Sequence, residues 1–411
     1  GAAGVLVALG FVPGMPVFVL WTIAAGIFVI GRRTEDKKAA ESETAEEEKR
    51  GPDHEPTVEE LLEVDTLRLE IGFGLVSLVD EGSGGHLIER LGKMRRQFAS
   101  EFGIVVPPIH IRDNLGIPQG QYQLMLREVA IGSGDLLPNK LLAIDPGSVM
   151  HPVDGVKTKD PTFGLDALWI PEDARYAAEA SGYTVVDLET VVTTHVGELV
   201  RQNAAELLGW QELQLRLESV KQVVPKLVDD LGSNGVSHAD LLRMLRQLLR
   251  ERVSIRDLRT ILETVASHAG SDASVDAMVG HIRARLASQI SASFAGRERV
   301  IHAVLLDSQM EDQLRRCLLV QGKEPVLACD LATAQHLFAQ IEEAMGAFAA
   351  ADAEPVILAP PDLRGPLSAF LAQFFPNIHV ICHREVASRV QVRSIGQIGT
   401  GSGARALPDA A

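Results

Sequence analysis

Thr66-Leu-Arg-Leu-Glu-Ile71 alternates polar and apolar side chains with a period of two, which is typical of a β-strand that buries one face. After a Gly-rich loop at residues 81–85, apolar residues recur near helical spacing and predict an amphipathic helix over residues 86–102. Strand and helix patterns continue from Val64 to about residue 398. We therefore predict a globular region of mixed α/β and α+β type.

Short strand patterns continue up to residue 187, separated by Gly, Pro and Asp turns. Pro107 and Pro108 place the first of them at a sheet edge or a bulge. Residues 151–158 are expected to form a loop. The predicted strands cover residues 104–112, 122–131, 141–145, 167–170 and 183–187, and residues 72–79 are expected to extend the first strand.

The middle of the chain is predicted to be all-helical, with helices over residues 190–208 and 211–224 and a further helix that starts or kinks at Pro225. Ser237-His-Ala-Asp240 and Ser254-Ile-Arg-Asp257 both match the Ser/Thr-x-x-Asp/Glu capping box, and each stands before an apolar run of helical spacing. We expect each serine to cap the helix that follows it.

The last part of the chain alternates strand and helix again, which predicts βαβ crossovers and a mainly parallel sheet. The Gly/Ala-rich tail 399–411 is expected to be disordered. The predicted strands cover residues 299–306, 325–327, 355–359, 379–382 and 390–398, and the predicted helices cover 310–319, 332–348 and 363–375.

Val5 to Ile30 carries no charged side chain and is followed by Arg32-Arg33, which predicts a membrane segment with the downstream chain in the cytoplasm. Pro13-Gly14-Met15-Pro16 divides this run into the tail of one span, a turn and a final span within residues 1–33. A signal peptide is the alternative, but the run lacks a basic start and a cleavage site. We expect the chain to be a fragment of a larger membrane protein.

An acidic linker is predicted between the membrane segment and the globular region, over residues 34–63. Residues 34–60 contain 11 acidic and 4 basic side chains, a net charge of −7, and almost no large apolar residue. Such a segment buries too little apolar surface to offset the entropy of ordering it. We expect a flexible, self-repelling tether or an inert spacer.

The 411 residues carry a net charge of −16, which argues against a general nucleic-acid binder. Six arginines between Val236 and His268 leave a helix-turn-helix DNA reader as one interpretation of the helical middle. The other is a solvated face that pairs with nearby acids. The arginines are Arg243, Arg246, Arg250, Arg252, Arg256 and Arg259, and the acids are Glu251, Asp257 and Glu263.

The chain shows no recognisable catalytic or cofactor motif. It lacks a P-loop, a GxSxG elbow and an HExxH motif, and its three cysteines are too few and too dispersed for a disulfide framework or a CxxC metal site. The cysteines are predicted to pack as small apolar residues, and His195 is predicted to be structural rather than a catalytic base. We expect no enzyme, no cofactor and no metal.

Seven motifs stand in order along the globular region. They are Val105-Val-Pro-Pro-Ile-His-Ile-Arg-Asp-Asn114, Ile131-Gly-Ser-Gly-Asp135, Leu142-Ala-Ile-Asp-Pro-Gly147, Asp160-Pro-Thr-Phe-Gly-Leu-Asp-Ala-Leu-Trp169, Gly182-Tyr-Thr-Val-Val186, Thr194-His195 and Val253-Ser-Ile-Arg-Asp-Leu-Arg-Thr-Ile-Leu-Glu263. Together they resemble the FlhA/SctV export-gate family of type III protein secretion, over about residues 1–398. Gly10-Phe-Val-Pro-Gly-Met-Pro16 is similar to the turn before the family's last transmembrane helix. The family's signature membrane segments lie upstream, so no residue here is assigned to proton coupling.

The resemblance implies a component of protein export in the bacterial inner membrane, with residues 34–411 in the cytoplasm. It implies four subdomains that assemble with other copies into a nine-membered ring. The implied partners are chaperone–cargo complexes, other export-gate membrane proteins and an export ATPase complex. The subdomains are expected at 64–138 plus 188–207 (α/β), 139–187 (small and β-rich), 208–287 (all-helical) and 288–398 (α/β, βαβ-like).

The resemblance also implies a chaperone-binding groove between the first two subdomains, with Asp160 and Phe163 on one side and Thr194 on the opposing helix. Physically, Pro161 and Gly164 would stiffen a turn that presents Phe163 outward beside a carboxylate. The alternative is that Phe163 packs inward and Asp160 only caps the turn.

Two other functions are compatible with the sequence. The same architecture would serve an injectisome instead of a flagellum, although the Ile131–Asp135 run and the length of the fourth subdomain favour the flagellar branch. A membrane-anchored α/β enzyme with an unrecognised site is the alternative from another class.

Overall fold

The computed structural model describes residues 65–399, apart from residues 81, 83, 148, 234, 235, 269–273, 297, 322, 323 and 352. The predicted membrane segment (1–33), the predicted linker (34–63) and all but the first residue of the predicted tail (399–411) lie outside the described residues. Within the described part, none of the helices combines the length and the apolar character needed to cross a membrane.

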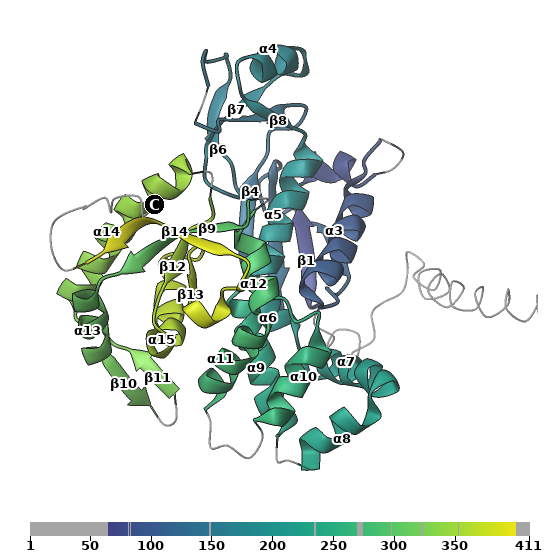
Figure 1. Cartoon of the computed structure of the whole chain (residues 1–411). Helices are drawn as coiled ribbons and strands as arrows, with labels where there is room; N and C mark the ends of the chain where they lie inside the picture. Colours follow the sequence, from purple (N-terminus) through teal and green to yellow (C-terminus); the bar gives the residue numbers. More distant parts are fainter. Residues whose placement is uncertain are drawn as a thin grey trace, which may run out of the picture. The chain divides into compact units, whose positions relative to one another are not determined.

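The predicted first strand is confirmed as β1 (Leu67–Ile71), in the interior of a four-stranded sheet of order β2-β1-β3-β4. It runs parallel to β2 and antiparallel to β3, which in turn pairs antiparallel with β4. Leu67, Leu69 and Ile71 are buried, as the alternation predicts. The remaining elements are β2 (Ile109–Asp113), β3 (Gln121–Leu126), β4 (Val129–Asp135) and the predicted helix, α3 (Leu87–Phe102) (Figure 1).

The prediction that residues 72–79 extend β1 is wrong, because Phe73–Leu78 forms a 3₁₀ helix. The chain turns at Gly72, whose N–H donates to Gln121 O at 2.8 Å. A side chain at Gly72 would place its Cβ 2.2 Å from Pro118 O, so the loop before β3 closes over this position. Strand β1 therefore ends at Ile71, because the backbone at Pro118 and Gln119 lies directly against Gly72.

Two predicted strand boundaries are also wrong. Residues 122–131 form two strands rather than one, because Arg127 and Glu128 adopt φ of 46° and 67° in a tight hairpin turn. The strand predicted over 104–112 begins only at Ile109, after the two prolines. The predicted edge position is confirmed, since β2 lies at the end of its sheet.

A second four-stranded sheet has the order β6-β7-β5-β8, and its paired strands are antiparallel. Its strand β6 (Val156–Lys159) was expected as part of a loop, and its exposed Val156 and Lys157 show why no buried face was visible. The other elements are β5 (Leu141–Ile144), β7 (Asp166–Ile170), α4 (Arg175–Ala180) and β8 (Thr184–Val186).

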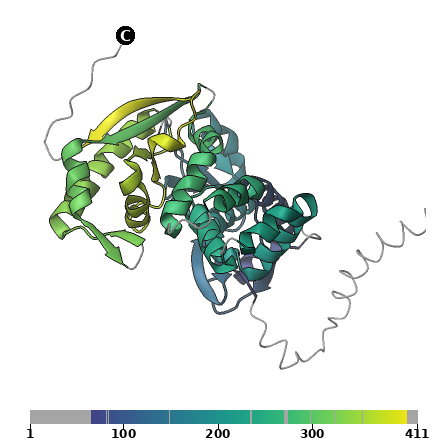
Figure 2. The ribbon, with the colours of Figure 1, turned by 60° about the horizontal axis from the view of Figure 1, so that its bottom comes forward.

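The middle of the chain is helical, as predicted. The helix predicted over 190–208 is interrupted at Asn203, whose Nδ2 donates to Leu199 O at 2.8 Å. The helices are α5 (Leu188–Gln202), α6 (Ala204–Leu207), α7 (Trp210–Val223), α8 (Pro225–Ser233), α9 (His238–Arg250), α10 (Leu258–Ser267), α11 (Val275–Arg285) and α12 (Ala287–Phe294) (Figure 2).

Only one of the two predicted capping serines caps a helix. Ser237 Oγ accepts from Asp240 N at 3.0 Å at the start of α9. At the second motif the N-cap of α10 is Asp257, whose side chain accepts from Thr260 N at 3.1 Å. Ser254 Oγ instead donates to Glu101 O at 2.6 Å.

The Ser254–Glu101 hydrogen bond is one of four contacts through which the helical segment caps the end of α3. These four contacts are called the α3 joint. Arg256 Nη1 donates to Ser100 O at 3.0 Å, Ile255 N donates to Phe102 O at 3.0 Å, and Arg216 Nη1 donates to Gly103 O. Gly103 has φ of 77°, and a Cβ there would lie 2.4 Å from Arg256 Cα. Four successive carbonyls of α3 and its C-cap are thus satisfied, three by residues 254–256 and the fourth by Arg216 of α7.

The arginine-rich face of the helical segment is engaged with the protein itself. Each of its six arginines has a partner: Asp240 for Arg243, Leu208 O for Arg246, Glu206 for Arg250, Glu198 for Arg252, Ser100 O for Arg256 and Glu263 for Arg259. Only the Arg259–Glu263 pair matches the partners that were expected.

The C-terminal part contains the predicted parallel sheet, with order β13-β12-β9-β14 and every pair parallel. The helix predicted over 310–319 ends at Arg316, because Leu318–Gln321 forms a strand that pairs antiparallel with Glu324–Leu327. The elements are β9 (Val300–Leu306), α13 (Ser308–Arg316), β10 (Leu318–Gln321), β11 (Glu324–Leu327), α14 (Leu331–Ala350), β12 (Val356–Leu358), α15 (Pro361–Leu371), β13 (His379–Ile381) and β14 (Gln391–Ile398).

Candidate functional site

The turn between β6 and β7 presents an aromatic ring to solvent. Phe163 is 64% exposed, whereas Asp160 is only 4% exposed. The Asp160 carboxylate accepts the N–H groups of Thr162 and Phe163 at 3.1 and 2.6 Å, and Asp160 O accepts from Gly164 N at 2.9 Å. Asp160 therefore caps the turn, while Phe163 points outward.

The turn is rigid for local reasons. Asp160 N also donates to Leu165 O at 2.8 Å, which closes the loop on both sides. Gly164 adopts φ of 70°, a conformation that favours glycine. These backbone contacts fix the turn that carries Phe163, and its ring remains largely exposed to solvent. A partner protein could therefore cover the ring without a rearrangement of the turn.

Thr194 lies on the exposed side of α5, one residue before a buried histidine. Asp187 caps this helix by accepting from Thr190 N at 2.7 Å, and Val191, Val192 and Val196 are buried against the first sheet and α3. This spacing leaves Thr194 on the exposed side of the helix, beside α3.

A groove of about 390 Å³ lies between α3 and α5 and contains Thr194. Apart from Arg201, its α5 side consists of small residues, among them Thr190 and Gly197, while α3 contributes Met94 and the largely buried Phe98. The lining residues are Arg90, Lys93, Met94, Gln97, Phe98, Glu101, Thr190, Thr193, Thr194, Gly197 and Arg201. Small residues facing apolar ones fit the apolar face of an amphipathic helix. The three lining cations already pair with acids of this chain, Arg90 with Asp187, Lys93 with Glu89 and Arg201 with Glu198.

Phe163 and Thr194 do not share this groove in the described residues, because neither Asp160 nor Phe163 lines it. The turn and α5 are linked instead through a buried pair. Tyr122 Oη lies 2.8 Å from His195 Nδ1, and the Asp160 carboxylate acts electrostatically on both side chains. Burial lowers the pKa of His195 and raises the pKa of Tyr122, so the pair is uncharged at neutral pH. His195 is structural, as predicted.

Two buried hydroxyls next to the predicted residues have no hydrogen-bond partner among the described residues. Thr162 Oγ1 precedes Phe163 in the turn, and Thr193 Oγ1 precedes Thr194 on α5. Unsatisfied buried polar atoms are uncommon and mark places where a bound partner or a local rearrangement completes the bonding. Sequence reasoning missed both threonines, although Thr162 stands inside the quoted Asp160–Trp169 motif and Thr193 directly precedes the quoted Thr194-His195.

The described residues offer no grouping of three or more His, Cys, Asp or Glu side chains arranged for a metal ion. Cys382 is buried, and Cys317 and Cys329 are half-buried against the C-terminal core. Burial raises the pKa of Cys329 to about 12, so its thiol stays protonated at neutral pH. Cys317 and Cys329 thus pack against the apolar core, as predicted, whereas the buried Cys382 Sγ donates to Glu385 Oε1 at 3.4 Å, a polar contact that the prediction did not include.

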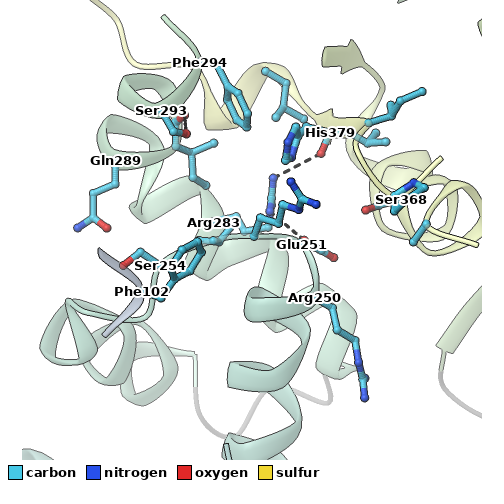
Figure 3. Close-up of a pocket in the computed structure, with 18 of the residues that line it drawn as sticks. Phe102, Arg250, Glu251, Ser254, Arg283, Gln289, Ser293, Phe294, Ser368 and His379 are labelled. Carbon is cyan, nitrogen blue, oxygen red and sulfur yellow. Dashed lines mark hydrogen bonds and ion pairs between the residues drawn. The ribbon is translucent and has the colours of Figure 1, made fainter. Parts of the chain in front are cut away.

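A second cavity, of about 240 Å³, lies where the end of α3, the α9–α10 loop, α12 and β13 meet (Figure 3). Phe102, Phe294 and His379 line it, and Arg283 lies at its inner wall. Burial lowers the pKa of His379 to about 4, so the imidazole is neutral at physiological pH. The lining mixes apolar and polar groups without a convergent set of catalytic side chains.

Comparisons with known proteins were made for the whole chain. The FHIPEP family model matches residues 1–391. Flagellar biosynthesis protein FlhA of Escherichia coli K12 is 37% identical over 403 residues, covering 97% of this chain and 57% of that protein. The FlhA proteins of Salmonella typhimurium and Bacillus subtilis are 38% and 31% identical, with 97% of this chain and 57% and 59% of those proteins covered. The chain thus spans little more than half the length of these relatives.

Solved structures share the fold at lower identity. The Chlamydia pneumoniae CdsV protein matches with a TM-score of 0.70 at 24% identity, covering 82% of this chain and 98% of that one. The nonameric SctV-C of EPEC matches with a TM-score of 0.64 at 21% identity, covering 82% and 99%. A CdsV chain solved together with CdsO matches with a TM-score of 0.69 at 23% identity, covering 85% and 100%.

Proposed function

The chain belongs to the FHIPEP family, and from that premise we propose that it is the end of the membrane region and the cytoplasmic part of a flagellar type III protein-export gate. The family match over residues 1–391 carries this proposal. Relatives at 31–38% identity that are named as flagellar biosynthesis proteins support the flagellar branch. Its role is in protein transport rather than in catalysis.

The proposal includes four subdomains with the boundaries expected from the sequence. The sheet of β1–β4, the sheet of β5–β8 and the parallel sheet around β9 each fall within one of the proposed ranges, and helices α7 to α11 fall within the third, which supports this division. Helix α12 (Ala287–Phe294) crosses the proposed boundary between the third and fourth subdomains. Residues 1–33 would lie in the bacterial inner membrane, and residues 34–411 would lie in the cytoplasm.

The proposed assembly is a ring of identical chains, for which nine copies are suggested by the nonameric SctV-C of the same fold. Its proposed partners are chaperone–cargo complexes, the other membrane proteins of the export gate and the export ATPase complex. No cofactor enters the proposal. Docking would be the task of the exposed cytoplasmic surface, and transport would follow through the membrane part of the gate.

We place chaperone docking at the Phe163 turn and the groove that contains Thr194. An exposed aromatic ring on a rigid turn loses little conformational entropy on binding and offers a large apolar contact. The groove between α3 and α5 would accept an apolar helix face. Thr162 and Thr193 would gain hydrogen-bond partners if docking opens the turn or the groove.

The test is the affinity of the whole chain for a flagellar chaperone–cargo complex. Phe163→Ala is expected to weaken binding by at least about tenfold, the loss typical of a hot-spot aromatic. Phe73→Ala is the matched control, because Phe73 is 66% exposed but lies on the 3₁₀ helix after β1. Asp160→Ala removes the acceptor for two backbone N–H groups, so its effect is interpreted only for protein that remains folded. Unchanged affinity in both turn variants would remove the site from the proposal.

The injectisome branch is the second candidate function, because a solved structure of the same fold carries the name SctV, the injectisome member of the family that the sequence resembles. Binding of flagellar and injectisome chaperones to the same chain separates the two. The flagellar proposal predicts stable capture of flagellar chaperones only, and selective capture of injectisome chaperones would contradict it.

A further inference from the structure

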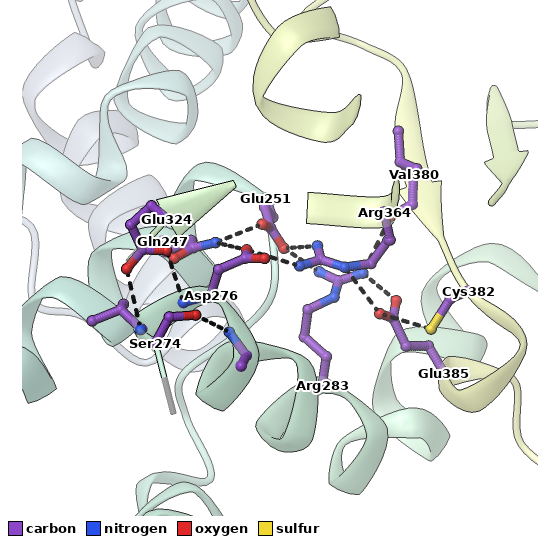
Figure 4. A network of polar contacts seen from close by, with 12 residues as sticks. Gln247, Glu251, Ser274, Asp276, Arg283, Glu324, Arg364, Val380, Cys382 and Glu385 are labelled. Atoms are coloured by element: carbon purple, nitrogen blue, oxygen red, sulfur yellow. Dashed lines mark hydrogen bonds and ion pairs between the residues drawn. The ribbon is translucent and has the colours of Figure 1, made fainter. Parts of the chain in front are cut away.

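Two buried arginines join the helical segment to the C-terminal α/β part (Figure 4). Arg283 on α11 and Arg364 on α15 are 2% and 3% exposed. Glu251 at the end of α9 contacts Arg283 at 2.9 Å and Arg364 at 2.5 Å. Glu385, in the 3₁₀ turn after β13, contacts Arg283 directly and Arg364 at 3.5 Å. Each of these two carboxylates is thus shared between both arginines.

Two more carboxylates, those of Asp276 and Glu324, belong to the same network of polar contacts. Asp276, in the first turn of α11, lies 3.6 Å from Arg364 and accepts from Gln247 Nε2 at 2.8 Å. Glu324 on β11 accepts the N–H groups of Val275 and Asp276 at 3.2 and 3.4 Å. The arginine–carboxylate joint, defined as Glu251, Asp276, Arg283, Glu324, Arg364 and Glu385, therefore sets four acids against two guanidinium groups.

The joint leaves Asp276 no space to move away from its neighbours. A Cβ added at Gly365 of α15 would lie 2.3 Å from Asp276 Oδ1, so the carboxylate is packed against the backbone of that helix. Burial raises the pKa of Asp276, and the charges of Glu251 and Glu324 raise it further. Arg364 and the Gln247 hydrogen bond act in the opposite direction.

We propose that the arginine–carboxylate joint is a proton-linked latch, in which proton uptake by Asp276 tightens the attachment of α15 to α11 and proton release loosens it. Asp276 is the acid whose charge is lost most cheaply, because its contact with Arg364 is the longest one in the joint. Arg364 keeps Glu251 and Glu385 as partners when Asp276 is neutral. Glu251 and Glu385 each satisfy two arginines, and Glu324 caps α11.

The direction of the effect follows from linkage. A folded-state pKa above the unfolded value means that the folded protein holds the proton more tightly than the unfolded chain. The stabilisation is therefore present at low pH and is lost as the pH rises through the raised pKa of Asp276. The charged groups that act on Asp276 are Glu251 at the end of α9, Arg364 from α15 and Glu324 from β11. Arg283 and Glu385 belong to the same network and contact Arg364 or Glu251 rather than Asp276.

The experiment follows amide hydrogen exchange of α15 in the whole 411-residue chain, held in detergent, from pH 4, near the ordinary aspartate pKa, up to pH 8. After correction for the intrinsic exchange rate, α15 is expected to open at least roughly threefold more often at pH 8 in the wild type. Asp276→Asn is expected to abolish this difference and to keep α15 protected at both pH values. Asp312→Asn is the control, since Asp312 on α13 is 64% exposed and pairs with Arg315 at 3.2 Å.

The proposal is overturned if Asp276→Asn retains the pH dependence of the wild type. It is also overturned if the carboxyl carbon of Asp276, followed by NMR in the wild-type chain and assigned through its connection to the backbone resonances of the same residue, titrates at or below the ordinary aspartate pKa of about 3.9. The second measurement needs no altered protein to be stable, so it decides the question even if the Asn variant folds poorly.

Discussion

The helical segment is joined to its two neighbours in physically different ways. At the α3 joint the acceptors are backbone carbonyls, and two arginines donate to them without a carboxylate among these contacts. At the arginine–carboxylate joint the acceptors are charged side chains that outnumber the arginines. Carbonyls do not titrate and carboxylates do, so only the second joint responds to pH. The α3 joint therefore holds the helical segment against α3 at any pH, whereas the strength of the arginine–carboxylate joint changes with pH.

The largest effect is expected at the arginine–carboxylate joint. Arg283→Met leaves Glu251 and Glu385 buried with Arg364 as their only common cation, and breaking a buried pair in this way costs about 3–5 kcal/mol. Chemical denaturation of the whole chain measures the loss. Arg315→Met is the matched control, because Arg315 contacts three acids but is 38% exposed. Its loss should be about 1 kcal/mol or less. Equal losses would mean that burial does not distinguish these ion pairs.

A smaller loss is expected at the α3 joint. Arg216 donates to Gly103 O and, at 3.3 and 3.4 Å, to Ile255 O and Arg256 O, so Arg216→Met deprives three carbonyls of a donor. We expect a cost of about 2 kcal/mol, because neighbouring groups continue to cap α3. The comparison predicts that this cost is the same at pH 5.5 and pH 8, whereas the cost of Arg283→Met changes between them. A pH-dependent loss in Arg216→Met would contradict the distinction between the joints.

Local pattern predicted most elements of this fold but not the contacts that join them. Period-two alternation identified β1, and alternation of strand and helix identified the parallel sheet around β9. The hairpin at Arg127 and Glu128 escaped prediction, because neither residue is a usual one for positive φ. Arg68, about 60 residues earlier, contacts Glu128 at 2.6 Å and stabilises the turn. A partner so distant in the sequence cannot be predicted from a pattern of neighbouring residues.

In the candidate site, too, the local sequence predicted the turn, whereas the features that depend on tertiary packing could not be predicted. The turn at Asp160–Gly164 was expected from its Pro and Gly, but whether Phe163 faces inward or outward depends on the sheet that carries the turn. The structure resolves this in favour of an exposed ring on a turn capped by Asp160. The separation of that ring from the Thr194 groove could not be predicted, because it depends on how α5 packs against α3 and the first sheet.

The smallest effect tests the two serine motifs, which look alike in sequence and differ in the structure. Ser254→Ala removes the hydrogen bond that Ser254 Oγ donates to Glu101 O and the longer one, of 3.3 Å, that it accepts from Arg256 N, and it should cost about 1 kcal/mol at the α3 joint. It should leave the start of α10 unchanged, because Asp257 caps that helix through Thr260 N. Amide exchange of Thr260 is the measurement: we expect no change in Ser254→Ala and faster exchange in Asp257→Ala. If Ser254→Ala instead frays α10, the serine acts as a helix cap after all, and the α3 joint loses one of its four contacts.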